Sequence, residues 1–266
     1  MKRLAFSALG LLAATPVAAQ QGDPRFCPTR PSLGASACTT EPGQVQFEYS
    51  AFDWQLDDTE DEREDRVLAA DLLARIGVSP STEVQVGWTA FGHVRARDKT
   101  TGAVDVANGV GDVTLALRQN LRNPDGSGLS FGIQPQVSLP VGHSGVGAGD
   151  WGAGVVLPVS YDLNDKLNLQ FTGEGDAAVD QDGDGRHFAY SGIVGLGYHV
   201  SDKFTATAEL SLERDNDPEG HETHSLAALS LAFQPRKTVQ FDLLAVAGLN
   251  RTSPDVRLVT GGAILF

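Results

Sequence analysis

The sequence of 266 residues predicts an all-β protein: a transmembrane up-and-down antiparallel β-barrel of about 12 strands with an irregular N-terminal periplasmic segment. Apolar and polar residues alternate with a period of two in run after run from residue 44 onward, as in β-strands. Short turns and longer loops alternate between these runs. The mean hydropathy of -0.14 excludes a polytopic helical membrane protein. It is compatible with a barrel, whose strands average an apolar lipid face with a polar lumen face.

The net charge of -14 argues against a nucleic-acid partner, because phosphates would be repelled. Disorder is also unfavoured, since acid-rich stretches are short and apolar residues recur regularly between them.

Residues 1–19 have the three regions of a secretory signal peptide. Lys2 and Arg3 form a basic start, Leu4 to Pro16 is mostly apolar, and small residues end the segment at Ala19. We expect cleavage after Ala19; the alternative is a buried N-terminal helix. The mature chain is therefore expected outside the cytosol, where disulfides form.

Residues 20–43 form a segment rich in proline that lacks strand or helix periodicity. It contains both cysteines of the chain, Cys27 and Cys38, which we expect to form a disulfide with each other. One interpretation is that this disulfide-closed segment caps or partly plugs the following domain. The other is that it is a tethered tail that does not contact that domain.

Twelve runs in residues 44–266 fit strands. In Leu129 to Val141 the apolar residues fall on one face and Ser, Gly and Gln on the other. In Glu83 to Arg95, Trp88 shares the apolar face, and His93 shares the polar face. The other runs are 44–54, 66–78, 111–121, 153–163, 166–176, 186–200, 204–213, 224–233, 238–249 and 256–266.

The connections between these runs are sorted by length. Tight turns are expected at 79–82, 122–128, 164–165, 201–203 and 234–237. Generally longer loops are expected at 55–65, 96–110, 142–152, 177–185, 214–223 and 250–255. Short turns on one rim and long loops on the other are typical of barrels in the bacterial outer membrane. An even number of strands returns both termini to the periplasmic rim.

The last run ends at Phe266, and an aromatic carboxyl terminus resembles the signal that the barrel assembly machinery recognises. Strands must pair all the way round because hydrocarbon offers no partner to an open sheet edge. We therefore expect the outer membrane of a Gram-negative bacterium, with outer-membrane lipids, lipopolysaccharide and the assembly machinery as partners.

The polar faces of the strands, taken as the lumen, carry ten acids and five bases. A small channel with a cation-leaning field is one interpretation; an occluded interior whose ion pairs stabilise the barrel is the other. The candidate lumen residues are Asp71, Arg75, Glu83, His93, Arg95, Asp112, Arg118, Glu174, Glu209, Asp242 and Arg257.

The expected loops are acidic. The loop from Asp57 to Asp65 holds seven carboxylates and is either a solvated face or a binder of divalent cations that bridge to lipopolysaccharide. Asp180 to Gly185 opens like a calcium loop, but Ser191 stands where a bidentate Glu is required. We expect a plain acidic loop and no metal or cofactor.

Histidine and serine occur side by side at His143-Ser144 and at His224-Ser225. Neither place shows the His-x-Ser-Asn-Gly arrangement of the twelve-stranded phospholipases, so we do not expect an enzyme.

Several short stretches resemble one family. They are Cys27-Pro-Thr-Arg-Pro-Ser-Leu-Gly34, Glu41 to Glu48, Leu73 to Val78 with Thr82-Glu83, Gly109 to Leu115, Leu139-Pro-Val-Gly142, Gly248-Leu-Asn250 and Ser253-Pro-Asp255. The chain resembles the outer-membrane transporter family labelled putative MetA-pathway of phenol degradation, with Val141 where a small hydroxylated residue is usual. The resemblance implies a barrel that passes small, aromatic or hydrophobic compounds.

Our leading hypothesis is thus a passive outer-membrane channel for a small-molecule solute. The alternative is a barrel that does not transport and serves envelope structure or surface interactions.

Overall fold

The computed structural model describes residues 24–183 and 185–266, so the expected signal peptide lies outside the described residues. In this part of the chain no helix is long and apolar enough to cross a membrane. The strands are β1 (Val45–Asp58), β2 (Glu62–Ser79), β3 (Thr82–Asp98), β4 (Val104–Gly109), β5 (Val113–Arg122), β6 (Leu129–Leu139), β7 (Gly152–Asn164), β8 (Leu167–Val179), β9 (Arg186–Ser201), β10 (Phe204–Asp217), β11 (Gly220–Arg236), β12 (Val239–Gly248) and β13 (Val256–Leu265).

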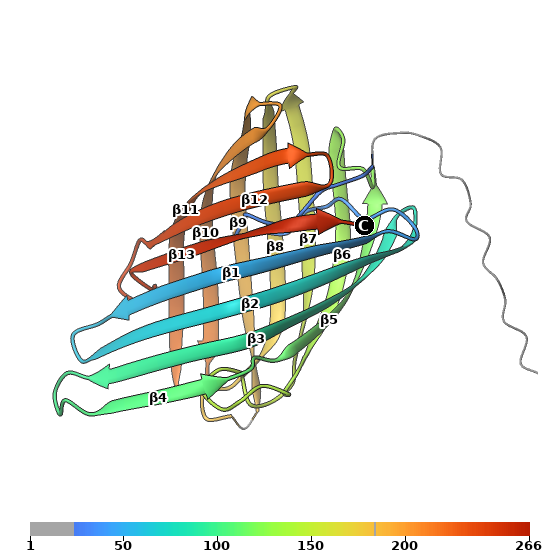
Figure 1. Cartoon of the computed structure of the whole chain (residues 1–266). Helices are drawn as coiled ribbons and strands as arrows, with labels where there is room; N and C mark the ends of the chain where they lie inside the picture. Colours follow the sequence, from blue (N-terminus) through green and yellow to red (C-terminus); the bar gives the residue numbers. More distant parts are fainter. Residues whose placement is uncertain (1–23, 184) are drawn as a thin grey trace, which may run out of the picture.

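The strands close into an antiparallel barrel (Figure 1). The ring closes where β1 pairs with β13, from Gln46 opposite Leu265 to Leu56 opposite Val256. One position in the ring is shared by two strands, because β5 pairs with the first half of β3 and β4 pairs with its second half. The barrel therefore has 12 positions and one extra strand, which confirms the predicted fold class.

The strands run further than the alternation of the sequence indicates. The expected acidic loop at 55–65 is a hairpin in which Asp57 lies opposite Glu64, and only residues 59–61 turn. The expected loop at 214–223 is likewise paired, with Asp217 opposite Gly220. In Figure 1, β1 to β4 project furthest beyond the ring. In these strand ends, charged residues occupy both faces, so the apolar–polar alternation is absent. Charged residues are tolerated there because the ends project beyond the membrane into water.

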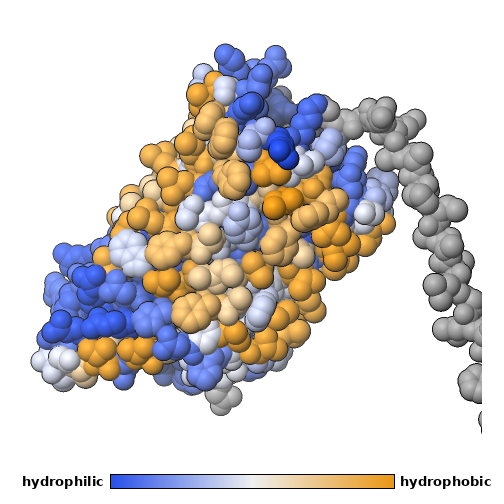
Figure 2. All heavy atoms as spheres, viewed as in Figure 1, coloured by the Kyte–Doolittle hydropathy of each residue, from blue (hydrophilic) through white to orange (hydrophobic). Residues whose placement is uncertain are grey.

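The barrel is apolar outside and polar inside. Its largest fully buried side chains include Arg75, Arg118, Gln46, Glu48 and Glu83. Large apolar side chains such as those of Leu229, Leu210 and Phe188 are at least 60% exposed. Figure 2 shows a broad apolar band across the visible face, with hydrophilic residues beyond it at the lower left and at the top. This inversion of an ordinary core fits a protein whose solvent is lipid.

A charge placed in this band should destabilise the barrel. We expect Leu229→Arg, in the middle of β11, to lower the free energy of unfolding by about 2–4 kcal/mol, because the guanidinium must enter hydrocarbon. Val104→Arg is the matched control, since Val104 is 44% exposed but lies on β4 beside the charged overhang. Urea titration of both variants folded into lipid vesicles measures the difference. Equal stability of the two would contradict the lipid-facing assignment.

An irregularity across β1 to β3 exchanges the inner and outer faces of these strands. The β1–β13 register shifts between Ser50 and Phe52, and Ala70 in β2 has a φ of 52°. Beyond it, Phe91 is 47% exposed and Gly92 is buried. One extra residue in a strand reverses which face every later side chain occupies.

This reversal moves two of the residues expected in the lumen. His93 follows the buried Gly92 and contacts Asn108 of β4, with 2.7 Å between Nδ1 and Oδ1. Arg95 lies opposite Asp65 in the overhang of β2. The structure therefore places His93 and Arg95 on the outer face of the overhang, and the unbroken alternation assumed from the sequence does not hold here.

Candidate functional site

The N-terminal plug, which we define as residues 24–43, lies inside the barrel at the rim of short turns. Its disulfide between Cys27 and Cys38 confirms the expected pairing. Its backbone and side chains bind wall residues all the way round. These residues are Glu48 and Ser50 on β1, Arg75 on β2, Glu83 on β3, Arg118 and Asn120 on β5, Thr172 on β8, Glu209 on β10, and Gln240 and Asp242 on β12. The plug thus follows the inner wall as a closed loop.

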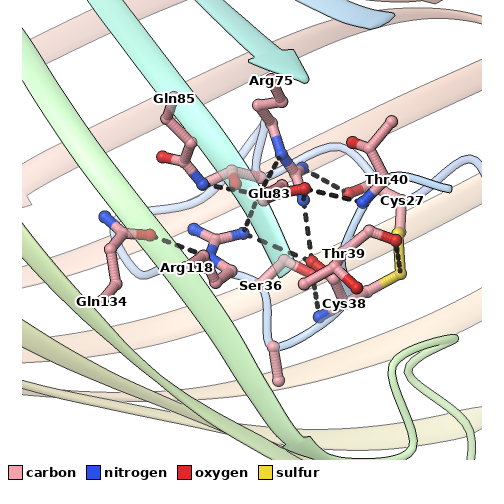
Figure 3. A network of polar contacts seen from close by, with 12 residues as sticks. Cys27, Ser36, Cys38, Thr39, Thr40, Arg75, Glu83, Gln85, Arg118 and Gln134 are labelled. Atoms are coloured by element: carbon pink, nitrogen blue, oxygen red, sulfur yellow. Dashed lines mark hydrogen bonds and ion pairs between the residues drawn. A yellow bond between two sulfur atoms is a disulfide. The ribbon is translucent and has the colours of Figure 1, made fainter. Parts of the chain in front are cut away.

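Arg75 joins the plug to the wall (Figure 3). Its guanidinium is fully buried and donates five hydrogen bonds: two to Glu83 at 2.9 and 3.2 Å, one to Glu48 at 3.0 Å, and one each to the carbonyls of Cys27 at 2.7 Å and Cys38 at 2.8 Å. A guanidinium has five N–H groups, so all of its donors are used. Lysine could not replace it, because an ammonium has three donors and no planar fork.

Glu83 is held by both the wall and the plug. Besides Arg75, it accepts hydrogen bonds from the Thr40 backbone N–H and from the Gln85 side chain, both at 2.6 Å. The Arg118 guanidinium lies 3.4 Å from Glu83 and also donates to the carbonyl of Cys38 (Figure 3). Burial without partners would be costly for any of these charges, but here each carboxylate oxygen and guanidinium has partners.

Glu48 binds the beginning of the disulfide loop. The backbone N–H groups of Thr29 and Arg30 donate to its carboxylate at 3.1 Å, and the Gln46 side chain donates at 2.8 Å. A carboxylate that receives several N–H groups fixes the backbone that carries them.

Arg30 and Ser32 extend these contacts along the wall to β12 and β10. Arg30 pairs with Asp242 at 2.8 Å and donates to Ser50 at 2.6 Å. Glu209 accepts the Ser32 hydroxyl at 2.6 Å and the backbone N–H of Leu33 at 3.0 Å.

Five of the expected lumen residues therefore meet around the plug: Arg75, Glu83, Arg118, Glu209 and Asp242. They bind the chain's own N-terminal segment, so their charges are satisfied within the protein. Sequence reasoning missed Asn120, Thr172 and Gln240 as plug-binding residues. In the sequence each of them is an uncharged polar residue on the lumen face of a strand. Such residues occur in every strand of a barrel of this kind, so they do not single out a binding site.

Other expected lumen residues lie beyond the plug. Asp71 accepts the Thr89 hydroxyl at 2.8 Å, and Arg257 donates to Asp53 at 2.9 Å. Glu174 accepts a hydrogen bond from Gln136 at 2.7 Å.

Asp112 anchors the connection between β6 and β7 instead of facing an open lumen. It accepts the backbone N–H of Gly142 at 2.8 Å and that of Ala148 at 2.7 Å. At the end of this connection the Trp151 N–H donates to Asp150 at 2.7 Å, which holds the pKa of that carboxyl below its usual range. The connection folds against the inner face of β3 and β4, where Val146 is buried near Gly92.

Two cavities lie on the two sides of the plug. The larger, about 840 Å³, is lined by the plug from Phe26 to Cys38 and by the short turns around Lys166 and Lys203. The smaller, about 200 Å³, is lined by mid-strand residues such as Gln85 and Gln136. Plug residues Thr29 and Ala35 line both cavities. The plug therefore borders both cavities.

The lumen beyond the plug has an acidic side. Glu174 and Asp176 on β8 lie near Glu213 on β10, close enough for their charges to interact. Among residues 24–183 and 185–266, none of these three carboxylates forms an ion pair with Lys or Arg.

A second side of the lumen is apolar. Ala228, Leu244, Val246 and Val259, on β11 to β13, form a buried cluster, and Leu33 of the plug packs against it. The polar lumen expected from the sequence thus has an apolar wall, which the alternation does not reveal because both faces of β12 are mostly apolar.

Comparisons with known proteins agree with this architecture. A family model described as Putative MetA-pathway of phenol degradation matches residues 30–264. No curated protein matches the sequence. Similar solved structures include the COG4313 outer membrane channel from Pseudomonas putida F1, with a TM-score of 0.70 and 14% identity over 86% of this chain and 97% of that one. The NalP translocator domain from Neisseria meningitidis has a TM-score of 0.53 and 11% identity over 85% of this chain and 90% of that one. The NanC porin has a TM-score of 0.50 and 12% identity over 83% of this chain and 98% of that one.

Proposed function

The chain belongs to the family described as Putative MetA-pathway of phenol degradation, and from this premise we propose that it is an outer-membrane channel of a Gram-negative bacterium for small solutes, without enzymatic activity. The observation that carries the proposal is the inverted barrel: charged side chains and cavities lie inside, and large apolar side chains lie outside. The N-terminal plug is the constriction of this channel.

The walls of the lumen indicate the class of solute. The acids Glu174, Asp176 and Glu213 favour cationic or neutral solutes, because unpaired carboxylates in a narrow, low-dielectric lumen repel anions. The apolar cluster of Leu244, Val246 and Val259 offers a surface to a solute with an apolar part. We therefore propose small amphiphilic compounds, aromatic ones among them, as the solutes.

The partners follow from the same architecture. Lipid and lipopolysaccharide would surround the apolar band, and the barrel assembly machinery would recognise the last strand. Phe266 supports the second point because its side chain is 74% exposed at the end of β13, while its backbone pairs with Val45.

Ion selectivity tests the acidic side of the lumen. We expect Glu174→Gln combined with Asp176→Asn to lower the cation-to-anion permeability ratio by about twofold or more, because two negative charges leave a narrow lumen. Reversal potentials in planar bilayers under a salt gradient measure this ratio. Glu60→Gln with Asp61→Asn makes the same change in charge in the exposed turn between β1 and β2. An equal effect of the control pair would contradict a lumen assignment.

The rival function is a closed barrel with a structural role in the envelope. The observation that favours it is the close fixation of the plug to the wall by Arg75 and Glu83. Conductance distinguishes the two functions, since a closed barrel passes no ions with or without the plug disulfide.

A further inference from the structure

A cluster on the rim of long connections remains unused by the channel. His187, near the start of β9, lies among three carboxylates: Asp180 before the strand, and Asp215 and Asp217 at the end of β10. The side chain of His187 is 5% exposed, and those of Asp180 and Asp217 are 12% and 9% exposed. This rim is opposite to the plug, so the cluster is independent of the channel constriction.

The distances within the cluster fit the ligands of one metal ion. His187 Nδ1 lies 2.9 Å from Asp180 Oδ1 and 3.4 Å from Asp217 Oδ2. Zinc binds imidazole nitrogen and carboxylate oxygen at about 2.0–2.2 Å, so two ligands of a tetrahedral zinc lie roughly 3.3 Å apart. The three ligand atoms converge within 4.8 Å of one another.

The other imidazole nitrogen provides an independent indication. His187 Nε2 is buried and makes no hydrogen bond of acceptable geometry, although Asp215 Oδ1 lies 2.6 Å away. When Nδ1 binds a metal, Nε2 carries the proton and commonly donates it in a hydrogen bond to a carboxylate. That hydrogen bond orients the imidazole ring and increases the basicity of Nδ1. Asp215 is the carboxylate that lies within reach of Nε2.

The negative charge of the cluster also favours a bound cation. Among the described residues, the ion pairs of Asp180, Asp215 and Asp217 are with His187 alone, so one imidazole faces three carboxylates. A neutral His187 with a divalent ion would balance most of this charge.

We propose that Asp180, His187 and Asp217 bind one first-row divalent metal ion, with Zn²⁺ as the probe, and that Asp215 orients His187 from behind. The calcium-like beginning of the loop at Asp180 lacks its twelfth-position Glu, and the neighbouring β10–β11 hairpin supplies the missing carboxylate through Asp217. A histidine ligand favours zinc over calcium, which prefers oxygen ligands alone.

The test is zinc binding to the untagged, folded full chain in detergent micelles, followed by calorimetry and by metal analysis after gel filtration. We expect one Zn²⁺ per chain, resistant to excess Ca²⁺ and Mg²⁺. His187→Ala and Asp217→Asn should abolish this binding, and Asp215→Asn should weaken it by about 10- to 100-fold. His224→Ala, which removes a histidine from the adjacent β11, is the matched control and should bind zinc normally.

Three outcomes would overturn the proposal: no stoichiometric zinc on the wild-type chain, equal zinc binding by His187→Ala, or calcium binding that competes with zinc and does not depend on His187. A change in gel mobility on heating shows that each variant is folded, so loss of binding cannot be attributed to an unfolded barrel.

Discussion

Replacing Arg75 by methionine should destabilise the folded barrel by about 3–5 kcal/mol, because it leaves Glu48 and Glu83 buried without their cation. The same change removes the hydrogen bonds to the carbonyls of Cys27 and Cys38, so the plug should also lose its attachment to β2. Urea titration of the protein in lipid vesicles, followed by tryptophan fluorescence and gel mobility, measures the loss.

Two further variants separate this effect from a general one. Arg63→Met removes an arginine from the same strand, but the pair of Arg63 with Asp65 lies at the surface, so we expect little or no change in stability. Adding Glu48→Gln and Glu83→Gln to Arg75→Met should recover part of the stability, because no uncompensated charge then remains. The account is contradicted if Arg75→Met and Arg63→Met are equally stable.

Removing the plug disulfide should open the channel. The bond between Cys27 and Cys38 closes the part of the plug that follows the wall, and a loop of this size is stabilised by about 3 kcal/mol in the chain-entropy model. We expect the double variant Cys27→Ser/Cys38→Ser to form the same barrel, because the wall pairs without the plug, but to show a several-fold higher single-channel conductance.

The wild-type protein is its own control in this experiment. A reductant added on the side of the short turns should raise the wild-type conductance to the level of the double variant, and should not change the variant itself. If the double variant conducts like the oxidised wild type, the disulfide loop is not the constriction.

The ring of strands could be predicted from the sequence because lipid imposes a pattern on it. Between Leu129 and Val141, every second residue must be apolar because it faces lipid, and the residues between them face the lumen. This alternation alone identifies the strand. Where the chain leaves the hydrocarbon this constraint ends. Strand β1 therefore extends to Asp58 and β2 begins at Glu62, although the sequence of this part predicts an acidic loop.

The faces of the residues were less predictable than the strands. An irregularity that crosses β1 to β3 turns His93 and Arg95 outward, and its mark in the sequence of β3 is a single residue, Phe91, which is large and apolar at a position of the polar face. The plug illustrates a different limit. Cys27 and Cys38 predict a disulfide-closed segment, and Arg75 and Glu83 predict a charged lumen, but only the folded structure shows that the segment and the lumen residues bind each other.

The measurement that tests the central claim most directly is solute uptake by liposomes that contain the oxidised wild-type protein. A small quaternary aromatic ammonium ion and an aromatic sulfonate of the same size are suitable probes, because neither crosses lipid alone. The account predicts uptake of the cation faster than that of the anion, and faster again through the Cys27→Ser/Cys38→Ser variant. Uptake of both probes no faster than into protein-free liposomes, for both proteins, would contradict the assignment of this barrel as a channel.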